Sequence, residues 1–328
     1  MNYIGSKVSL LSFLEESIKE AVGDISDKVF FDLFAGTGAV GSYFNNKVKS
    51  VYANDFEYYS LMLNYNLLLQ QEQYDGLHDL NFDRLNNLEP TEGFIWRHYS
   101  PAGGRMYFTE ENAKKIDAMR EDMFNSFLRV GERVHLLASL IESADRVANT
   151  TSVYGAYLKK FKSTAIKELV LKPSPFTVSP YDKNKVFQEP AEAIVGSYDC
   201  DILYLDPPYN SRQYGANYHL LNTISRKEKF EPQGVTGLPE IYNKSAFCSK
   251  RTVMKSFNNL ISNAKAEHIF LSYNNEGLMS IPVIKSIMER FGEYSLFTKE
   301  DYKRYKADSN REYKADSTTE YLHHLRKK

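Results

Sequence analysis

The chain has 328 residues, of which 42% are hydrophobic and 25% charged, with a mean hydropathy of −0.47 and a formal net charge of −1. This composition is typical of a soluble globular protein with one large or two modest domains. It excludes a globally basic nucleic-acid-binding surface, so any such role must come from local patches. No apolar run approaches a membrane span and the N-terminus does not resemble a signal peptide, so we expect a cytoplasmic protein.

The chain begins with a regular alternation of helices and strands. Apolar spacing predicts a helix over residues 8–22. A strand over 28–34, a helix that opens within the stretch 35–41 and ends at about 46, a strand over 48–53 and a helix over 58–69 follow. This pattern predicts the parallel, doubly wound sheet of an α/β protein.

The pattern changes after the second of these strand–helix pairs. Residues 71–180 are more polar, without clean alternation, and contain two strong amphipathic helix candidates at 110–127 and 133–148. We therefore expect a mostly helical inserted domain at 71–180 that interrupts a catalytic domain formed by 1–70 and 181–328.

Alternation resumes in the last third of the chain. The expected elements are a strand at 185–187, a helix at 191–195, a strand at 201–205, a helix at 251–264, a strand at 268–273 and a helix at 282–291. In the tail, two similar five-residue segments, 305–309 and 313–317, predict either a hairpin that turns around Asn310 or a single mobile loop. We expect His323 and His324 to lie on the surface, because neither has a metal-ligand partner nearby in the sequence.

A glycine-rich stretch follows the first strand. Gly36-x-Gly38-x-x-Gly41 matches the dinucleotide fingerprint, and Asp55 at the end of the next strand is placed to bind ribose hydroxyls. Together they predict a nucleoside cofactor. Asp32, just before the glycines, would repel a pyrophosphate but suits an ammonium group. We therefore prefer S-adenosylmethionine to a nicotinamide cofactor.

A second motif, Asp206-Pro207-Pro208-Tyr209, ends the apolar strand at 201–205. In an open α/β sheet this edge binds ligands. The Asp206 carboxylate and a proline carbonyl can accept the two N–H bonds of an exocyclic amino group, and Tyr209 can stack on an extruded base. The motif thus predicts methylation of a base amino group. Methylation at cytosine C5 would require a Pro-Cys nucleophile loop, and neither Cys200 nor Cys248 lies in one.

In motif order the chain resembles the alpha-class (D12 type) site-specific DNA adenine-N6 methyltransferases. Tyr3-Ile4-Gly5-Ser6-Lys7 is similar to the family's aromatic-x-Gly-Gly-Lys start, with Tyr3 in place of Trp and Ser6 in place of the second Gly. The glycine motif, the insert and the catalytic motif then follow in family order. After the strand at 185–187, Gln188 and Glu189 both remain candidates for the contact to the cofactor adenine.

The resemblance implies a Rossmann-like core and a set of site residues. The catalytic residues would be Asp206, Pro207, Pro208 and Tyr209. The cofactor-binding residues would be Tyr3, Lys7, Asp32, Phe34, Gly36, Gly38, Asp55, Phe56, Gln188 and Asp206. No metal is expected.

DNA contacts are expected from the insert and from the loop after the catalytic motif. Residues 151–172 interleave aromatic and basic side chains, with five Lys against one Glu. The expected DNA-binding residues are Arg105, Lys159, Lys160, Lys162, Arg212 and Tyr214.

The sequence therefore predicts methyl transfer from S-adenosylmethionine to N6 of adenine in a specific short double-stranded DNA sequence, with the base flipped out. The resemblance also implies protection against a cognate restriction endonuclease, and we expect a monomer. Amino methylation of RNA or of cytosine N4, methylation of protein glutamine and a non-enzymatic DNA-binding module remain alternatives.

Overall fold

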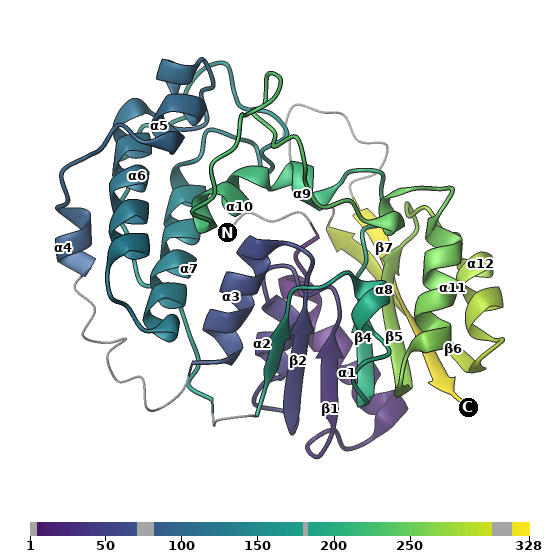
Figure 1. The fold of residues 1–328 in the computed structure, drawn as a ribbon. Helices are drawn as coiled ribbons and strands as arrows, with labels where there is room; N and C mark the ends of the chain where they lie inside the picture. Colours follow the sequence, from purple (N-terminus) through teal and green to yellow (C-terminus); the bar gives the residue numbers. More distant parts are fainter. Residues whose placement is uncertain (1–4, 71–81, 180–182, 304–316) are drawn as a thin grey trace. The chain divides into compact units, whose positions relative to one another are not determined.

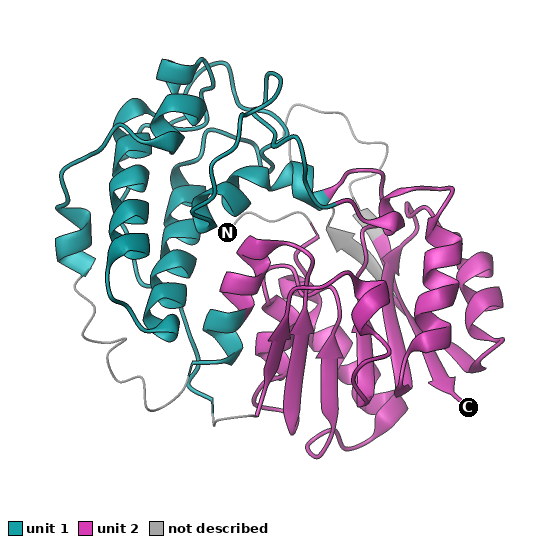
Figure 2. Ribbon diagram, in the orientation of Figure 1, with its two compact units in different colours: residues 1–4, 65–180, 214–243 teal, residues 5–64, 181–213, 244–328 magenta. Residues whose placement is uncertain are grey.

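The computed structural model describes residues 5–70, 82–179, 183–303 and 317–328. The chain divides into two compact units, which are treated separately below (Figure 2). Unit 1 is formed mainly by residues 65–180 and 214–243, and unit 2 by residues 5–64, 181–213 and 244–328. Among the described residues, no helix is long and apolar enough to span a bilayer.

Unit 2 contains a seven-stranded sheet in the order β3-β2-β1-β4-β5-β7-β6 (Figure 1). The strands are β1 (Val29–Asp32), β2 (Ser50–Asn54), β3 (Lys185–Phe187), β4 (Cys200–Leu205), β5 (Ala266–Asn274), β6 (Gly292–Lys303) and β7 (Ser317–Lys327). β1 to β5 pair in parallel, and β7 runs antiparallel to both β5 and β6. This arrangement confirms the predicted Rossmann-like α/β core.

Helices cover both faces of the sheet because successive strand residues point to opposite sides. On one face, Phe30 of β1 stacks on Phe44 of α2 with ring centroids 4.5 Å apart. On the other face, Phe31 belongs to a buried cluster with Phe257 of α11 and Ile284 of α12. The helical elements of this unit are η1 (Val8–Leu10), α1 (Leu11–Val22), α2 (Ala39–Phe44), α8 (Ala191–Ile194), η4 (Ala246–Cys248), α11 (Val253–Asn263) and α12 (Ile281–Met288), and α3 (Tyr58–Leu68) crosses the unit boundary.

Unit 1 is mainly helical. Its helical elements are α4 (Phe82–Asn86), α5 (Phe94–Tyr99), η3 (Pro101–Gly103), α6 (Glu110–Asn125), α7 (Val130–Val147), α9 (Tyr214–Asn217) and α10 (His219–Ser225). The side chain of Thr109 caps α6 by accepting a bond from the N–H of Asn112, and two glutamates in the first turn favour the helix dipole. The predicted helices at 110–127 and 133–148 are thus present with slightly different ends.

Residues 214–243 belong to unit 1, whereas the sequence-based division places them in the catalytic domain. A buried arginine is one of the residues that join this segment to unit 1. The Arg120 guanidinium on α6 donates hydrogen bonds to the carbonyls of Thr223, Ile224 and Arg226 at the end of α10. A cation at a helix C-terminus satisfies carbonyls that have no partner within the helix. A contact 103 residues apart in the chain has no local sequence signature.

The expectation that His323 and His324 lie on the surface is wrong. Both lie in β7 and are buried: the His324 ring stacks on that of Phe270 with centroids 4.5 Å apart, and the His323 ring lies 5.9 Å from that of Tyr294. The Nδ1 atom of His323 contacts the Tyr294 hydroxyl at 2.8 Å, and the Nε2 atom of His324 contacts Nδ1 of His268 at 2.9 Å. Burial lowers the pKa of each of the two tail histidines to about 4, so both are neutral at pH 7.

The tail repeat lies largely outside the described residues, and so does the turn expected around Asn310. The strands on either side, β6 and β7, form an antiparallel pair with a register shift between Lys299 and Tyr302. This direction matters for the site. Because β7 is antiparallel to β5, its first residues lie at the edge of the sheet where the parallel strands end.

Candidate active site

The predicted catalytic and cofactor motifs meet at the carboxyl edge of the sheet. β1 and β4 are parallel neighbours, with Asp32 paired in register with Tyr204. Asp206 follows β4, so its carboxyl group emerges at the same edge as that of Asp32. β2 ends beside β1, which brings Asp55 to this edge as well. Three carboxylates far apart in the sequence are thus gathered by strand order.

The glycine loop between β1 and α2 is held in shape by side chains from α3 and from the end of β2. Gly36 and Gly38 have φ values of 52° and 79°, in the left-handed region that glycine adopts without strain. The N–H of Gly36 donates to Oδ2 of Asp55 at 2.8 Å, and its carbonyl accepts bonds from Ser60 and Asn64. The loop backbone is therefore fixed by the protein itself.

Asp32 fits a cationic ligand group. Its side chain is buried, and Oδ2 accepts a bond from the N–H of Gly41 at 3.2 Å. Within the described part of the chain, Oδ1 has no hydrogen-bond partner. Burial, reinforced by the negative charge of Asp206, raises the pKa of Asp32 well above its usual value. A buried carboxylate without a counter-charge suits the ammonium group of S-adenosylmethionine, so this residue fits the cofactor that the sequence predicts.

Asp55 fits the ribose of the same cofactor. Its oxygens accept bonds from the N–H groups of Gly36 and Glu57, and a carboxylate is also a suitable acceptor for ribose hydroxyls. Burial raises its pKa, and these backbone bonds oppose the rise. Next to it, the Gln188 amide donates to the carbonyl of Phe56 at 3.4 Å. Gln188 is half-buried and Glu189 is exposed, which favours Gln188 of the two candidates.

Asp206 forms a largely buried ion pair. Nζ of Lys7 lies 3.0 Å from Oδ1 of Asp206, and the two side chains are 7% and 18% exposed. Burial raises the pKa of Asp206 to about 6, while Lys7 opposes and Glu320 reinforces this rise. Lys7 itself stays charged, because the nearby carboxylates outweigh its burial and raise its pKa. Asp206 is therefore mostly ionised at neutral pH and becomes protonated below about pH 6.

Sequence reasoning missed the third member of this cluster, Glu320 of β7. Its Oε1 atom lies 3.3 Å from Nζ of Lys7 and accepts a bond of 2.6 Å from the Ser272 hydroxyl of β5. A lone glutamate in a polar tail carries no sequence signal, and only the reversed direction of β7 brings it to the site. Ser60 and Asn64 were also missed, although a polar pair four residues apart on the apolar helix α3 offers a usable signal.

The catalytic loop after β4 is anchored at several points. The N–H of Leu278 donates to the carbonyl of Tyr209 at 3.1 Å. The Gln213 side chain exchanges two bonds with the backbone of Ser245. Tyr209 is half-buried and packs against the apolar core, whereas the Arg212 side chain is exposed. The loop geometry is thus fixed while Arg212 remains available to solvent.

The other predicted residues have different surroundings. Pro207 is buried, Pro208 and Phe34 are half-buried, and the Phe34 ring packs edge-on against Phe247 with centroids 5.3 Å apart. Tyr214 begins α9 in unit 1, where its ring lies 5.8 Å from that of Tyr218. Tyr3 lies outside the described residues.

The predicted DNA-binding residues of unit 1 fall into two groups. Lys159 and Lys160 are exposed. In contrast, Nζ of Lys162 donates to the carbonyl of Thr150 at 2.6 Å, and Arg105 donates to the carbonyls of His98 and Gly234. The latter two side chains therefore hold loops of unit 1 in place.

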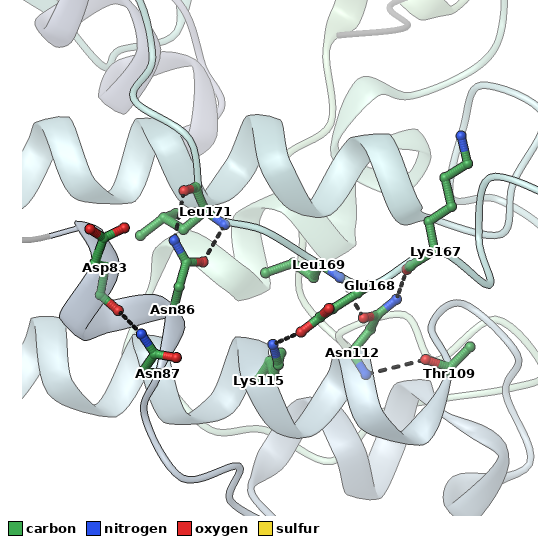
Figure 3. Close-up of polar contacts among 10 residues, drawn as sticks. All are labelled: Asp83, Asn86, Asn87, Thr109, Asn112, Lys115, Lys167, Glu168, Leu169 and Leu171. Atoms are coloured by element: carbon green, nitrogen blue, oxygen red, sulfur yellow. Dashed lines mark hydrogen bonds and ion pairs between the residues drawn. The ribbon is translucent and has the colours of Figure 1, made fainter.

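The segment that follows these lysines is fastened to α4 and α6 by two asparagines (Figure 3). Asn112 bonds the backbone of Lys167 and Leu169, and Asn86 bonds both backbone groups of Leu171. An ion pair between Lys115 and Glu168 adds to this attachment. The Lys167 side chain extends away from these contacts (Figure 3). The basic segment thus has a fixed backbone at one end and exposed lysines along its length.

The chain is similar to one protein family over most of its length. The profile of the D12 class N6 adenine-specific DNA methyltransferases matches residues 3–289. Type II methyltransferase M.NlaIII of Neisseria lactamica is 50% identical over 315 residues, covering 94% of this chain and 93% of that protein. Type II methyltransferase M.CviAII of Paramecium bursaria Chlorella virus 1 is 40% identical over 320 residues, with coverage of 94% and 93%. M.FokI of Planomicrobium okeanokoites is 39% identical over 328 residues, covering 94% of this chain and 50% of that longer protein.

The family match fixes the reaction and the methyl donor. The chain transfers a methyl group from S-adenosylmethionine to N6 of adenine in DNA. It belongs to the D12 class of N6 adenine-specific DNA methyltransferases.

Proposed function

We propose that Asp206, a carbonyl of the Pro207–Pro208 loop and Tyr209 hold the target adenine while its amino group is methylated. The observation that carries this assignment is the ion pair between Lys7 and Oδ1 of Asp206. It fixes the Asp206 carboxylate at the carboxyl edge of β4, next to the glycine loop. The second oxygen of this carboxylate, Oδ2, would then accept an N–H of the substrate.

The chemistry required of these residues is mainly positioning. The lone pair of an exocyclic amino nitrogen is delocalised into the ring and is a poor nucleophile. Two accepted N–H bonds, one to Oδ2 of Asp206 and one to a proline carbonyl, favour a pyramidal nitrogen whose lone pair points away from the ring. S-adenosylmethionine, when bound, supplies an electrophilic methyl group for direct in-line transfer. Tyr209 stacks on the adenine, which must leave the duplex to reach the site.

The cofactor contacts follow from the same edge of the sheet. Asp32 would accept bonds from the ammonium group and Asp55 from the ribose hydroxyls. The backbone of the glycine loop, with Gly36 and Gly38, lies between these two carboxylates. Phe34, Phe56 and Gln188 would surround the cofactor adenine, and Tyr3 would add a contact from the N-terminal motif.

Unit 1 would recognise a specific short double-stranded sequence, using Lys159 and Lys160 on phosphates and Arg212 and Tyr214 near the flipped base. Arg105 and Lys162 would support the loops that carry such contacts. Because similar proteins are named type II methyltransferases, we also propose that this enzyme protects host DNA in the bacterial cytoplasm from a cognate restriction endonuclease. It would act as a monomer.

The test is long-read sequencing of DNA from a methylation-free bacterial host that expresses the protein. We expect N6-methyladenine at nearly every copy of one short sequence and at no other. DNA from cells expressing an Asp206→Ala variant should be unmodified. Methylation scattered without a common sequence, or unchanged methylation with the variant, would overturn the proposal.

A further inference from the structure

We propose that Glu320 is a positioning residue for methyl transfer: it holds Lys7 against Oδ1 of Asp206, so that the carboxylate keeps the correct orientation for the adenine amino group. This inference rests on the role of Asp206 proposed above. It adds a residue of the last strand to the catalytic machinery, where no sequence motif had placed one.

The contacts form a continuous chain from the sheet to the catalytic carboxylate. The Ser272 hydroxyl of β5 donates to Oε1 of Glu320 at 2.6 Å. The same oxygen lies 3.3 Å from Nζ of Lys7, which in turn lies 3.0 Å from Oδ1 of Asp206. The Glu320 side chain is only 4% exposed. A lysine side chain has four rotatable bonds, and a second carboxylate partner restricts it to one direction.

The fold makes Glu320 a rigid support. Glu320 pairs in register with Asn274 at the end of β5, and on its other side with Lys299 of β6. Its backbone is therefore held in the sheet on both sides, unlike that of Lys7, which precedes the first helical turn. Precise placement of a flexible group is best achieved from a rigid element.

The cluster also has an unbalanced charge. One ammonium group, Lys7, serves two carboxylates, Asp206 and Glu320. A third carboxylate, Asp32 of β1, and the phenols of Tyr204 and Tyr209 also face the cluster. For Asp206, Lys7 favours the ionised form and Glu320 opposes it. Removing the charge of Lys7 or of Glu320 should therefore move the ionisation of Asp206 in opposite directions, which a purely structural role would not predict.

The experiment compares Glu320→Gln, Glu320→Ala and Lys7→Met with a matched control, Glu293→Gln, at an exposed position of β6. Steady-state methylation of duplex DNA is measured from pH 5 to 9, and S-adenosylmethionine binding is measured by calorimetry. A carboxyl-carbon NMR titration of Asp206 in the cofactor-free protein gives a readout that does not depend on turnover.

Glu320→Gln keeps the acceptor for Ser272 and Lys7 but removes the charge. We expect kcat at pH 8 to stay within about twofold of the wild-type value. The acidic limb of the pH–rate profile, where activity falls with falling pH, should shift to lower pH by about half a unit, and the NMR titration of Asp206 should shift by the same amount. Lys7→Met should shift the limb upward by about one unit or more. Glu320→Ala should lower kcat by about tenfold or more, with little change in the KM for DNA. The reason is that Lys7 no longer has a carboxylate that holds it against Asp206.

The inference is overturned if Glu320→Gln leaves the acidic limb and the titration unchanged, a result that does not depend on how well Glu320→Ala folds. It is also overturned if a folded Glu320→Ala variant has the kcat of Glu293→Gln. The Asp206→Asn variant distinguishes a failure of the role proposed for Asp206 from a failure of the role proposed for Glu320. If that variant turns over normally, the proposed role of Asp206 fails and this inference with it. If it is inactive while both Glu320 variants behave like the control, only the role of Glu320 fails.

Discussion

Asp32 is the residue of this site whose ionised form is least favoured by its surroundings. It is buried, one of its oxygens has no partner among the described residues, and its neighbour Asp206 carries the same charge. Backbone hydrogen bonds from Gly41 and Phe34 favour its ionised form, but burial and the charge of Asp206 outweigh them. A carboxylate in such a position is useful only when a cation binds beside it.

We therefore expect Asp32→Asn to stabilise the cofactor-free protein and weaken cofactor binding. The pKa of Asp32 is higher in the folded than in the unfolded state, so its ionisation costs stability once the pH exceeds its unfolded value of about 4. The melting temperature at pH 7 should rise by about 2 °C or more, and the gain should vanish as the pH falls towards 4.

The same variant should bind S-adenosylmethionine roughly tenfold more weakly, because the substitution removes a charged hydrogen bond. Calorimetry and thermal unfolding give both numbers on one sample, with the exposed Asp27→Asn as a control. A variant that binds the cofactor normally would contradict the role of Asp32, whatever its melting temperature.

A site residue can be predicted from the sequence when it ends a parallel strand, but not when distant antiparallel strands bring it to the site. Asp32, Asp55 and Asp206 end parallel strands, and parallel strands end at one edge, so strand order alone brings them together. Glu320 and Ser272 meet through an antiparallel pairing of β5 with β7, across 48 residues of chain. Such a contact depends on the register of distant strands, which local patterns do not encode.

At the scale of elements, the parallel core was predictable because each strand is a short apolar run between turn residues. The last strand was not. His323 and His324 look like surface residues, yet they are buried because aromatic side chains of neighbouring strands pack against them. Likewise, residues 214–243 join unit 1 through long-range hydrogen bonds, among them those of Arg105 and Arg120, which no periodicity reveals.

The basic segment of unit 1 leads to a prediction at this scale. Replacing Lys159 and Lys160 together with alanine should raise the KM for DNA while leaving kcat nearly unchanged, because both side chains are exposed and far in sequence from the catalytic motif. The slope of the logarithm of the DNA association constant against the logarithm of the salt concentration should become shallower by about 0.9 for each phosphate that the variant no longer neutralises.

The matched control for this pair is Lys28→Ala with Lys49→Ala. These lysines precede β1 and β2, at the edge of the sheet opposite the carboxylates. Equal effects of the two double variants on DNA affinity and salt slope would show that the segment at 151–172 makes no special contribution.

At the scale of the whole molecule, one chain combines a sheet that binds a cofactor with a helical unit that interrupts it in sequence. Unit 1 draws on residues from both sides of the catalytic motif. The site itself, from Lys7 to Glu320, is built entirely from residues of unit 2. If unit 1 selects the DNA target as proposed, its residues can change without altering the cluster of Lys7, Asp206 and Glu320.

The most direct test of adenine-N6 methylation and of the role of Asp206 compares the wild-type protein with Asp206→Asn. Methyl transfer from radiolabelled S-adenosylmethionine to duplex DNA is measured, and the labelled nucleosides are then identified. We expect all label from the wild type in N6-methyldeoxyadenosine, and a loss of at least about a hundredfold in kcat for the variant with cofactor binding retained. Label in N4-methyldeoxycytidine, label only in RNA or protein, or normal turnover by Asp206→Asn would contradict it.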